Sequence, residues 1–116
     1  MRHPDWVARL AALLREAEAR TFHPRDWNCA LFALAAVEAV TGRQPAVRVL
    51  PHLAHSADSA GFPRMPALLA GPGDVALAPN PDRLGVVLDA GRVAFVGPSG
   101  LLRAPITHCT HAWRIG

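Results

Sequence analysis

The chain has 116 residues, a length that suits one domain, so a single domain over residues 1–116 is expected. Hydrophobic residues make up 51% and charged residues 18%, a composition that excludes a disordered tail. The formal net charge is +3, and the basic side chains are all Arg, scattered along the chain rather than gathered on one helix, so no nucleic-acid partner is expected.

Secretion and membrane insertion are also not expected. The longest apolar run, Cys29–Val37, is far shorter than the roughly 20 residues of a membrane span. The N-terminal pattern is amphipathic and includes Asp5, unlike a signal peptide. Two cysteines, Cys29 and Cys109, do not make a disulfide framework. These features predict a chain made in the cytoplasm, with no membrane span.

The first predicted element is a helix over about residues 4–20. Pro4 suits a first helical turn, where its missing N–H costs nothing, and Asp5 complements the positive end of the helix. An apolar stripe recurs at helical spacing and consists of Trp6, Leu10, Leu13, Leu14 and Ala17. This helix is therefore expected to pack on the domain through one face.

A second helix is predicted over residues 29–41. Asn28 is a good N-cap because its side-chain oxygen can accept an orphan N–H of the first turn. Gly42 is a good residue to end the helix. Since Glu38 is the one charged residue in between, the helix is apolar on nearly every side and is expected in the centre of the domain.

Strand-like patterns follow the break at Gly71-Pro72-Gly73. Before it, residues 43–73 predict mostly loop, with one turn of helix near residues 66–70. Strands are predicted over residues 74–78, 84–88, 92–96, 101–104 and 112–115. The second and third are expected to form a tight hairpin across residues 89–91. Helices followed by an antiparallel meander predict an α+β domain.

Cys29 begins the second predicted helix, directly after its N-cap. A thiol at that place meets the positive end of the helix dipole and free backbone N–H groups, which favour the thiolate. The same N–H groups can hold an oxyanion during acyl transfer. A structural interpretation stays open beside this one, in which Cys29 is a small buried hydrophobic residue.

Four segments, in order, resemble those of a known family. Phe22–Gly42 (FHPRDWNCALFALAAVEAVTG) resembles the F-x-W-G-x-x-D-C … T-G segment of the papain-like, NlpC-type cysteine peptidases. Gly73–Leu77 resembles the GDV strand that opens their sheet, and Leu84–Val87 and Ala112–Ile115 resemble later strands. The resemblance covers most of the chain and is strongest to short proteins of phage tail modules, prophages and gene transfer agents.

This resemblance implies a fold and a role. The implied fold is α+β with a papain-like NlpC-type core, in which two N-terminal helices, the second buried, pack on a small antiparallel sheet. Cys29 would occupy the nucleophile position. The implied role is that of a structural protein of the tail tip or baseplate of a phage or gene transfer agent. It would contact other tail-tip, hub or baseplate proteins, and would be made in the host cytoplasm and assembled into the virion tail.

The chain departs from the family pattern at the catalytic base. Active members carry a histidine two residues before the glycine of an H-V-G-I strand, and Arg83 stands there instead. An arginine cannot take a proton from a thiol because its guanidinium stays protonated; it can at most stabilise a thiolate by charge. A dyad without its base loses orders of magnitude in rate, so a catalytically degenerate domain is expected.

Three histidines are candidate substitutes for the missing base. His23 lies on the loop that leads into Cys29, and His108 and His111 flank Cys109 near the last predicted strand. With one of them near Cys29, the chain would be an active cysteine peptidase that cleaves peptidoglycan stem peptides during DNA entry. That activity is the alternative to the structural role.

A metal-binding adaptor is a third, weaker possibility. On a strand, Cys109 and His111 would share a face and supply two ligands, while zinc takes three or four. A further ligand would have to come from Cys29, His23, His52 or His55. Because no spacing rule connects them, we expect no metal site and no cofactor, while metal binding by His108, Cys109 and His111 stays open.

Overall fold

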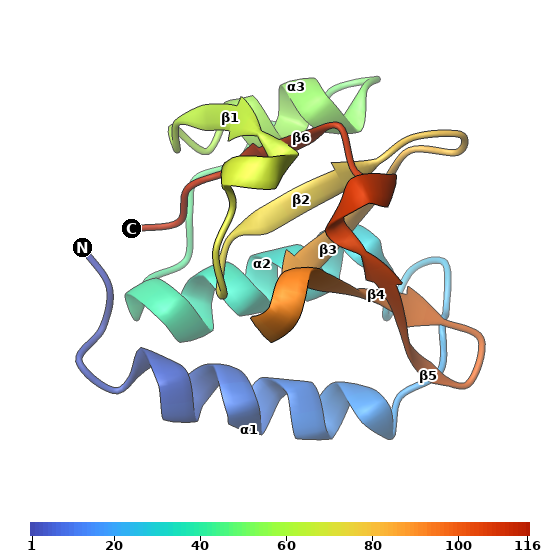
Figure 1. The fold of residues 1–116 in the computed structure, drawn as a ribbon. Coiled ribbons are helices and arrows are strands. Elements are labelled where there is room, and N and C mark those ends of the chain that lie inside the picture. The colour runs from blue at the N-terminus through green and yellow to red at the C-terminus, as the bar shows by residue number, and fades with distance from the viewer.

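A computed structural model describes residues 1–116 and shows three α-helices and one six-stranded antiparallel sheet (Figure 1). The helices are α1 (Trp6–Glu18), α2 (Cys29–Thr41) and α3 (Leu53–Asp58). The strands are β1 (Arg64–Pro66), β2 (Val75–Ala78), β3 (Arg83–Val87), β4 (Arg92–Gly97), β5 (Gly100–Pro105) and β6 (His111–Trp113). No helix has both the length and the apolar character that crossing a membrane requires.

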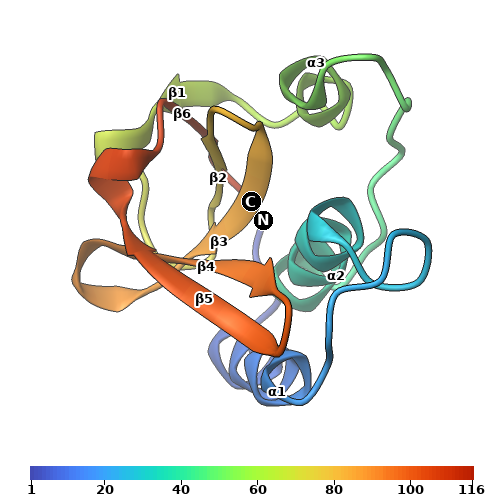
Figure 2. The ribbon, with the colours of Figure 1, turned by 90° about the vertical axis from the view of Figure 1, so that its right-hand side faces the viewer.

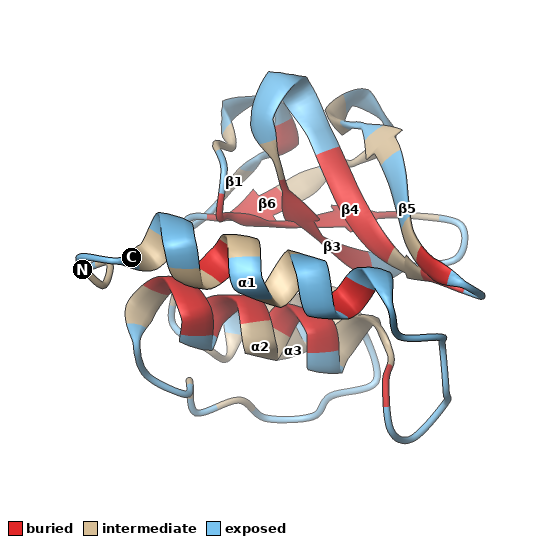
Figure 3. Ribbon diagram, turned by 90° about the horizontal axis from the view of Figure 1, so that it is seen from below, coloured by how far each residue is buried: buried red, intermediate tan, exposed pale blue.

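The predicted second helix is confirmed with its bounds and both ends. The Asn28 side chain accepts a hydrogen bond from the Leu31 N–H at 3.0 Å. At the other end Gly42 adopts a left-handed conformation, with φ 78°, and its N–H donates to the Glu38 carbonyl. Figure 3 shows that much of α2 is buried, and this helix packs on both α1 and β3. The first helix is two residues shorter at each end than predicted.

The sheet has the strand order β1-β6-β2-β3-β4-β5. Strands β2 to β5 form the predicted meander, and the predicted hairpin is confirmed by the pairing of Val87 with Val93. The last strand does not extend that meander beyond β5. Instead β6 returns to lie between β1 and β2, where Trp113 pairs with both Arg64 and Val75. Figure 2 shows how the sheet bends, so that β5 reaches α1 while β1 lies at the other end.

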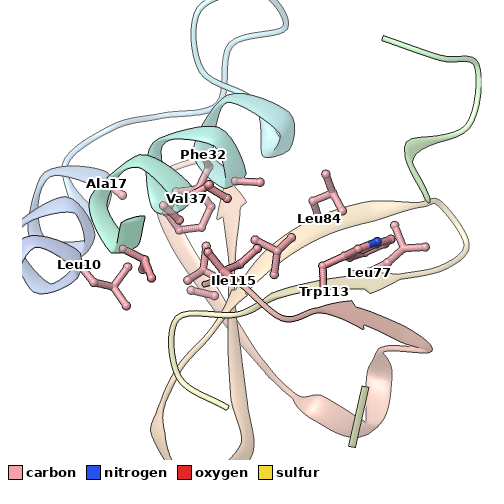
Figure 4. Close-up of a cluster of buried hydrophobic side chains, with 14 of the residues drawn as sticks. Leu10, Ala17, Phe32, Val37, Leu77, Leu84, Trp113 and Ile115 are labelled. Carbon is pink, nitrogen blue, oxygen red and sulfur yellow. The ribbon is translucent and has the colours of Figure 1, made fainter. Parts of the chain in front are cut away.

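The two faces of the sheet pack against different partners because side chains alternate along a strand. The helix face, which packs on α2 (Figure 4), is formed by Val75, Leu77, Leu84, Val86 and Trp113. The far face packs on the segments around β5 and is formed by Ala76, Ala78, Val87, Phe95 and Ala112. This assignment decides which side chains can approach Cys29.

The expected papain-like NlpC-type core is wrong. The chain is α+β, but a six-stranded sheet that makes up much of it replaces the small sheet, and there are three helices rather than two. The error arose in residues 43–73, where mostly loop was expected. Helix α3 and strand β1 come from this segment, and β1 extends the sheet by pairing with β6. The turn predicted near residues 66–70 is a 3-10 turn, Ala67–Leu69.

A buried carboxylate, Asp74, joins the two ends of the chain. Its Oδ1 accepts hydrogen bonds from the Ile115 N–H at 2.9 Å and from the Arg2 guanidinium at 3.1 Å, and its Oδ2 accepts one from the Gly71 N–H at 2.9 Å. Gly73, with φ +90°, lets Arg2 come this close, because a Cβ there would lie 3.0 Å from an Arg2 nitrogen. The Gly-Asp-Val segment is therefore structural.

Replacing Asp74 with Ala should lower the free energy of unfolding by about 2–4 kcal/mol, because it removes the carboxylate partner of the Arg2 guanidinium and leaves two N–H groups unpaired. Urea unfolding followed by circular dichroism measures the change. The matched control is Asp82→Ala, which removes an exposed carboxylate and should change stability by about 0.5 kcal/mol or less. Equal effects of the two substitutions would contradict this role for Asp74.

A second carboxylate ties α3 to the sheet. Asp58 accepts two hydrogen bonds from the Arg64 guanidinium, at 3.0 and 2.6 Å, and one from the Trp113 indole N–H at 2.8 Å. The Arg64 hydrogen bonds hold the pKa of Asp58 below its ordinary value near 3.8; desolvation opposes them, and the Trp113 hydrogen bond and the charges of Arg64 and His55 add to them. Asp58 thus stabilises the attachment of α3 while ionised.

Because this pKa is depressed, the stabilisation is present above about pH 4 and is lost as the pH falls through the folded-state value. Titration from pH 6 to pH 2 should shift the Trp113 indole N–H resonance in that acidic window. In Asp58→Asn the same resonance should lose this transition, whereas Asp82→Asn should keep it. An unchanged transition in Asp58→Asn would show that another group is responsible.

Candidate functional site

Cys29 is the first residue of α2 and is half-buried against the core that α2 shares with the helix face. Its neighbour Asn28 holds this helix start in place, since its side chain also donates to the Pro24 carbonyl at 2.9 Å. The cap occupies the Leu31 N–H, one of the backbone donors that an oxyanion at this helix end would use. The structure therefore has a thiol at the start of a buried helix, but one of the backbone N–H groups that could bind an oxyanion there is already hydrogen-bonded to Asn28.

Arg83, which stands at the expected position of the base, lies on the far face of the sheet. Its neighbour Leu84 belongs to the helix face, so alternation points Arg83 the other way. The guanidinium carbon lies 5.2 Å from the centre of the Phe95 ring, which is a far-face side chain. The sheet thus stands between Arg83 and α2, which begins at Cys29, and Arg83 is not placed to stabilise a Cys29 thiolate.

The positive charge of Arg83 affects the pKa of the other cysteine, Cys109, instead. Cys109 packs against the far-face cluster and is half-buried. Burial raises the pKa of the Cys109 thiol, and the nearby positive charge of Arg83 lowers it in part. Of the two cysteines in the sequence, Cys109 is therefore the one whose pKa the charge of Arg83 influences.

The three candidate histidines are spread over the molecule. His23 Nδ1 accepts hydrogen bonds from the N–H groups of Arg25 and Asp26, at 3.2 and 3.1 Å, and so closes its own turn. His108 is exposed at the end of the 3-10 turn after β5. His111 lies on the helix face of the sheet, the face that packs on α2. It pairs with Leu77 of β2, which in turn pairs with Leu84 of β3, so His111 and Leu84 are two strands, about 10 Å, apart.

No group of three or more His, Cys, Asp or Glu side chains is arranged to hold a metal ion. Cys109 lies outside β6 and packs on the far face, whereas alternation puts His111 on the helix face. The predicted loop at His52 and His55 is wrong, because α3 begins at Leu53. The two rings do meet at the start of α3, with centres 5.3 Å apart and edge to face.

A cavity of about 230 Å³ lies beside α2, and sequence reasoning missed it. It is lined by one face of α2, by α3, by the helix face of the sheet and by residues 43–52, the segment that joins α2 to α3 and that we call the strap (Figure 2). Fifteen of its 17 lining residues are hydrophobic, so the cavity suits an apolar group. Cys29 is not among them, although the next residue, Ala30, is.

Two serines of the α3 region hold the strap in place. Ser56 Oγ accepts the Leu50 N–H at 2.8 Å and donates to the Leu50 carbonyl at 3.2 Å. Ser59 Oγ accepts the Arg48 N–H at 2.8 Å and lies 3.4 Å from the Arg48 carbonyl. The signal for α3 was present as Leu53, Ala54 and Ala57, an apolar helical spacing that the neighbouring prolines and histidines obscured.

Removing the charge of Arg83 should slow the alkylation of Cys109 and leave Cys29 unaffected. In Arg83→Gln the lost positive charge raises the pKa of Cys109 further, and alkylation depends on the thiolate, so its rate at pH 7.5 should fall roughly twofold or more. Iodoacetamide labelling with peptide mass spectrometry resolves the two cysteines. Arg15→Gln on α1 is the matched control. Slower alkylation of Cys29 in Arg83→Gln would contradict this assignment, because it would show that the Arg83 charge acts on Cys29.

Comparison with known proteins identifies a family for this chain but gives no activity. The chain matches the family model described as Domain of unknown function (DUF6950), over residues 1–60 and 50–115. The two matched stretches together run from the first helix to the last strand and its following residues. No curated protein matches the sequence. Since the model accounts for nearly the whole chain, this protein belongs to the DUF6950 family.

Proposed function

We propose that this protein is a non-catalytic structural component of a phage or gene-transfer-agent tail, where it docks onto tail-tip, hub or baseplate proteins. The tail setting is suggested by the four segments that resemble proteins of phage tail modules. The lack of catalysis is supported by one observation above all. Arg83, which replaces the expected base, lies against Phe95 on the face of the sheet turned away from α2.

The positions of the histidines support the same proposal. A general base has to reach the thiol at hydrogen-bond distance, roughly 3–4 Å or through one water. His23 uses Nδ1 to accept two backbone N–H groups of its own turn, which leaves only Nε2 free, and His108 is exposed at the end of the 3-10 turn after β5. His111 is the one candidate on the helix face, and about 10 Å of sheet separates it from Leu84, the β3 residue in the core under α2.

Exposed apolar side chains on the surface support a role in docking onto other proteins. Large apolar side chains are exposed at several places, among them Val49 at 94%, Leu68 at 71%, Leu69 at 64% and Leu102 at 50%. Exposed apolar groups on a well-packed domain often mark contacts with other proteins. In the proposed setting the chain is made in the host cytoplasm and becomes buried among tail proteins during assembly, without a membrane span of its own.

The central test uses particles rather than the isolated chain. Cys29→Ala should leave particle yield and DNA delivery unchanged, because the proposed role needs no thiol chemistry. Cys109→Ala is the matched control for loss of a half-buried sulfur, and deletion of the gene should abolish or strongly reduce tail assembly. The protein should also be found in purified particles by mass spectrometry.

The purified protein should release no fragments from peptidoglycan. Cleavage of stem peptides that is blocked by iodoacetamide and lost in Cys29→Ala would overturn the proposal in favour of a cell-wall peptidase. Normal particles after gene deletion would overturn the tail role independently of any enzymatic result.

A further inference from the structure

A second cavity adjoins the apolar one and differs from it in character. It has a volume of about 240 Å³ and is lined by polar groups of Thr41, Arg43 and Gln44 beside apolar residues. Both cavities share the lining residues Val37, Pro45, Ala60 and Phe62. The two cavities thus adjoin at the strap and the end of α2, and we call the pair the hollow, with one apolar end and one polar end.

The polar end carries a positive charge that has no ion-pair partner. Arg43 is the one charged side chain that lines either cavity, and its guanidinium takes part in no ion pair. The nearby carboxylate of Glu38 accepts a hydrogen bond from Gln44 rather than from Arg43. Five residues further along the strap, Arg48 is also exposed and unpaired. The strap thus presents positive charge beside the hollow and no carboxylate within it.

The rim of the apolar end is itself apolar and exposed. Val49 and Leu50 of the strap, which both line the apolar cavity, are 94% and 36% exposed. Thr41 Oγ1 accepts the Arg43 backbone N–H at 3.2 Å, and its hydroxyl hydrogen lies between the Val37 carbonyl at 2.7 Å and the Arg43 carbonyl at 3.0 Å. The backbone of Arg43 is therefore anchored to the end of α2, beside the hollow.

We propose that this hollow binds an extended segment of a partner protein, with a large apolar side chain in the apolar cavity and an adjacent Asp or Glu carboxylate on Arg43. This inference rests on the docking role proposed above and names the partner's chemistry. The apolar cavity is large enough for such an anchor, since a dry apolar cavity of about 150 Å³ admits benzene. The carboxylate follows from charge complementarity with the unpaired strap arginines.

The first experiment selects peptides without assuming the partner. A random twelve-residue peptide library is panned on the immobilised full chain, and enriched peptides are synthesised and titrated by fluorescence anisotropy. The expected consensus is a Leu, Ile or Phe within a few residues of Asp or Glu. Enrichment of basic peptides, of peptides with no large apolar residue, or of none at all would overturn the proposal.

Variants then locate the bound peptide. Arg43→Gln should weaken binding about two- to fivefold, as expected for an exposed ion pair, while Arg92→Gln, at an exposed arginine on β4, should not change it. Ala57→Phe and Ala60→Phe should fill the hollow and weaken binding at least about tenfold. Arg43→Gln keeps the test valid even where a filling variant is unstable, because Arg43 is a surface side chain. Unchanged affinity in Arg43→Gln would overturn the proposed charge contact.

The same set of variants also tests two other possible occupants of the hollow, a lipid-like molecule and a second copy of the chain. Decanoate, an apolar chain with a carboxylate, is titrated as a competitor; decanoate binding without any peptide binding would show a lipid site and overturn the proposal. Concentration-dependent self-association that Ala60→Phe abolishes would identify a second copy of the chain as occupant and also overturn it. A failed peptide site would leave the tail role standing if the protein is still found in particles.

Discussion

The carboxylate of Asp74 is the group on which the arrangement of this domain depends. It lies in the interior, where an unpaired charge is costly, and it is satisfied by groups from the two ends of the chain and from the turn before β2. Arg2 completes the arrangement by donating to the carbonyls of Ile115 and Pro72 and lying over Trp6. Packing of α1, the sheet and both termini is therefore one cooperative unit.

Strand alternation decides what chemistry this scaffold can support. Residues 83 and 84 are adjacent in the chain, yet one points to the far face and the other to α2. The guanidinium at residue 83 accordingly belongs electrostatically to Cys109. A motif that matches by its letters can still put its key side chain on the other face of a sheet, as Arg83 does here relative to α2.

Sequence reasoning located the elements with strong local signals. Asn28 and Gly42 marked the ends of α2, and the turn residues 89–91 marked the hairpin of β3 and β4. It failed where pairing is long-range: β6 joins β2 and β1 across the chain, and no local pattern encodes such partners. Of the candidate site, Cys29 at the helix start was predictable, while the cavity was not, because it depends on α3 and the strap.

The strap is attached through side-chain hydroxyls rather than through a ladder of backbone hydrogen bonds. Ser56 bonds both the N–H and the carbonyl of Leu50, and Ser59 accepts the N–H of Arg48 while donating to the Ser56 carbonyl, so the roof of the apolar cavity is secured at two points, Leu50 and Arg48. In general, local opening of a segment held by few contacts costs less free energy than global unfolding, because the core beneath it can stay folded. Access to the interior would then be governed by two hydroxyl latches and not by the stability of the domain.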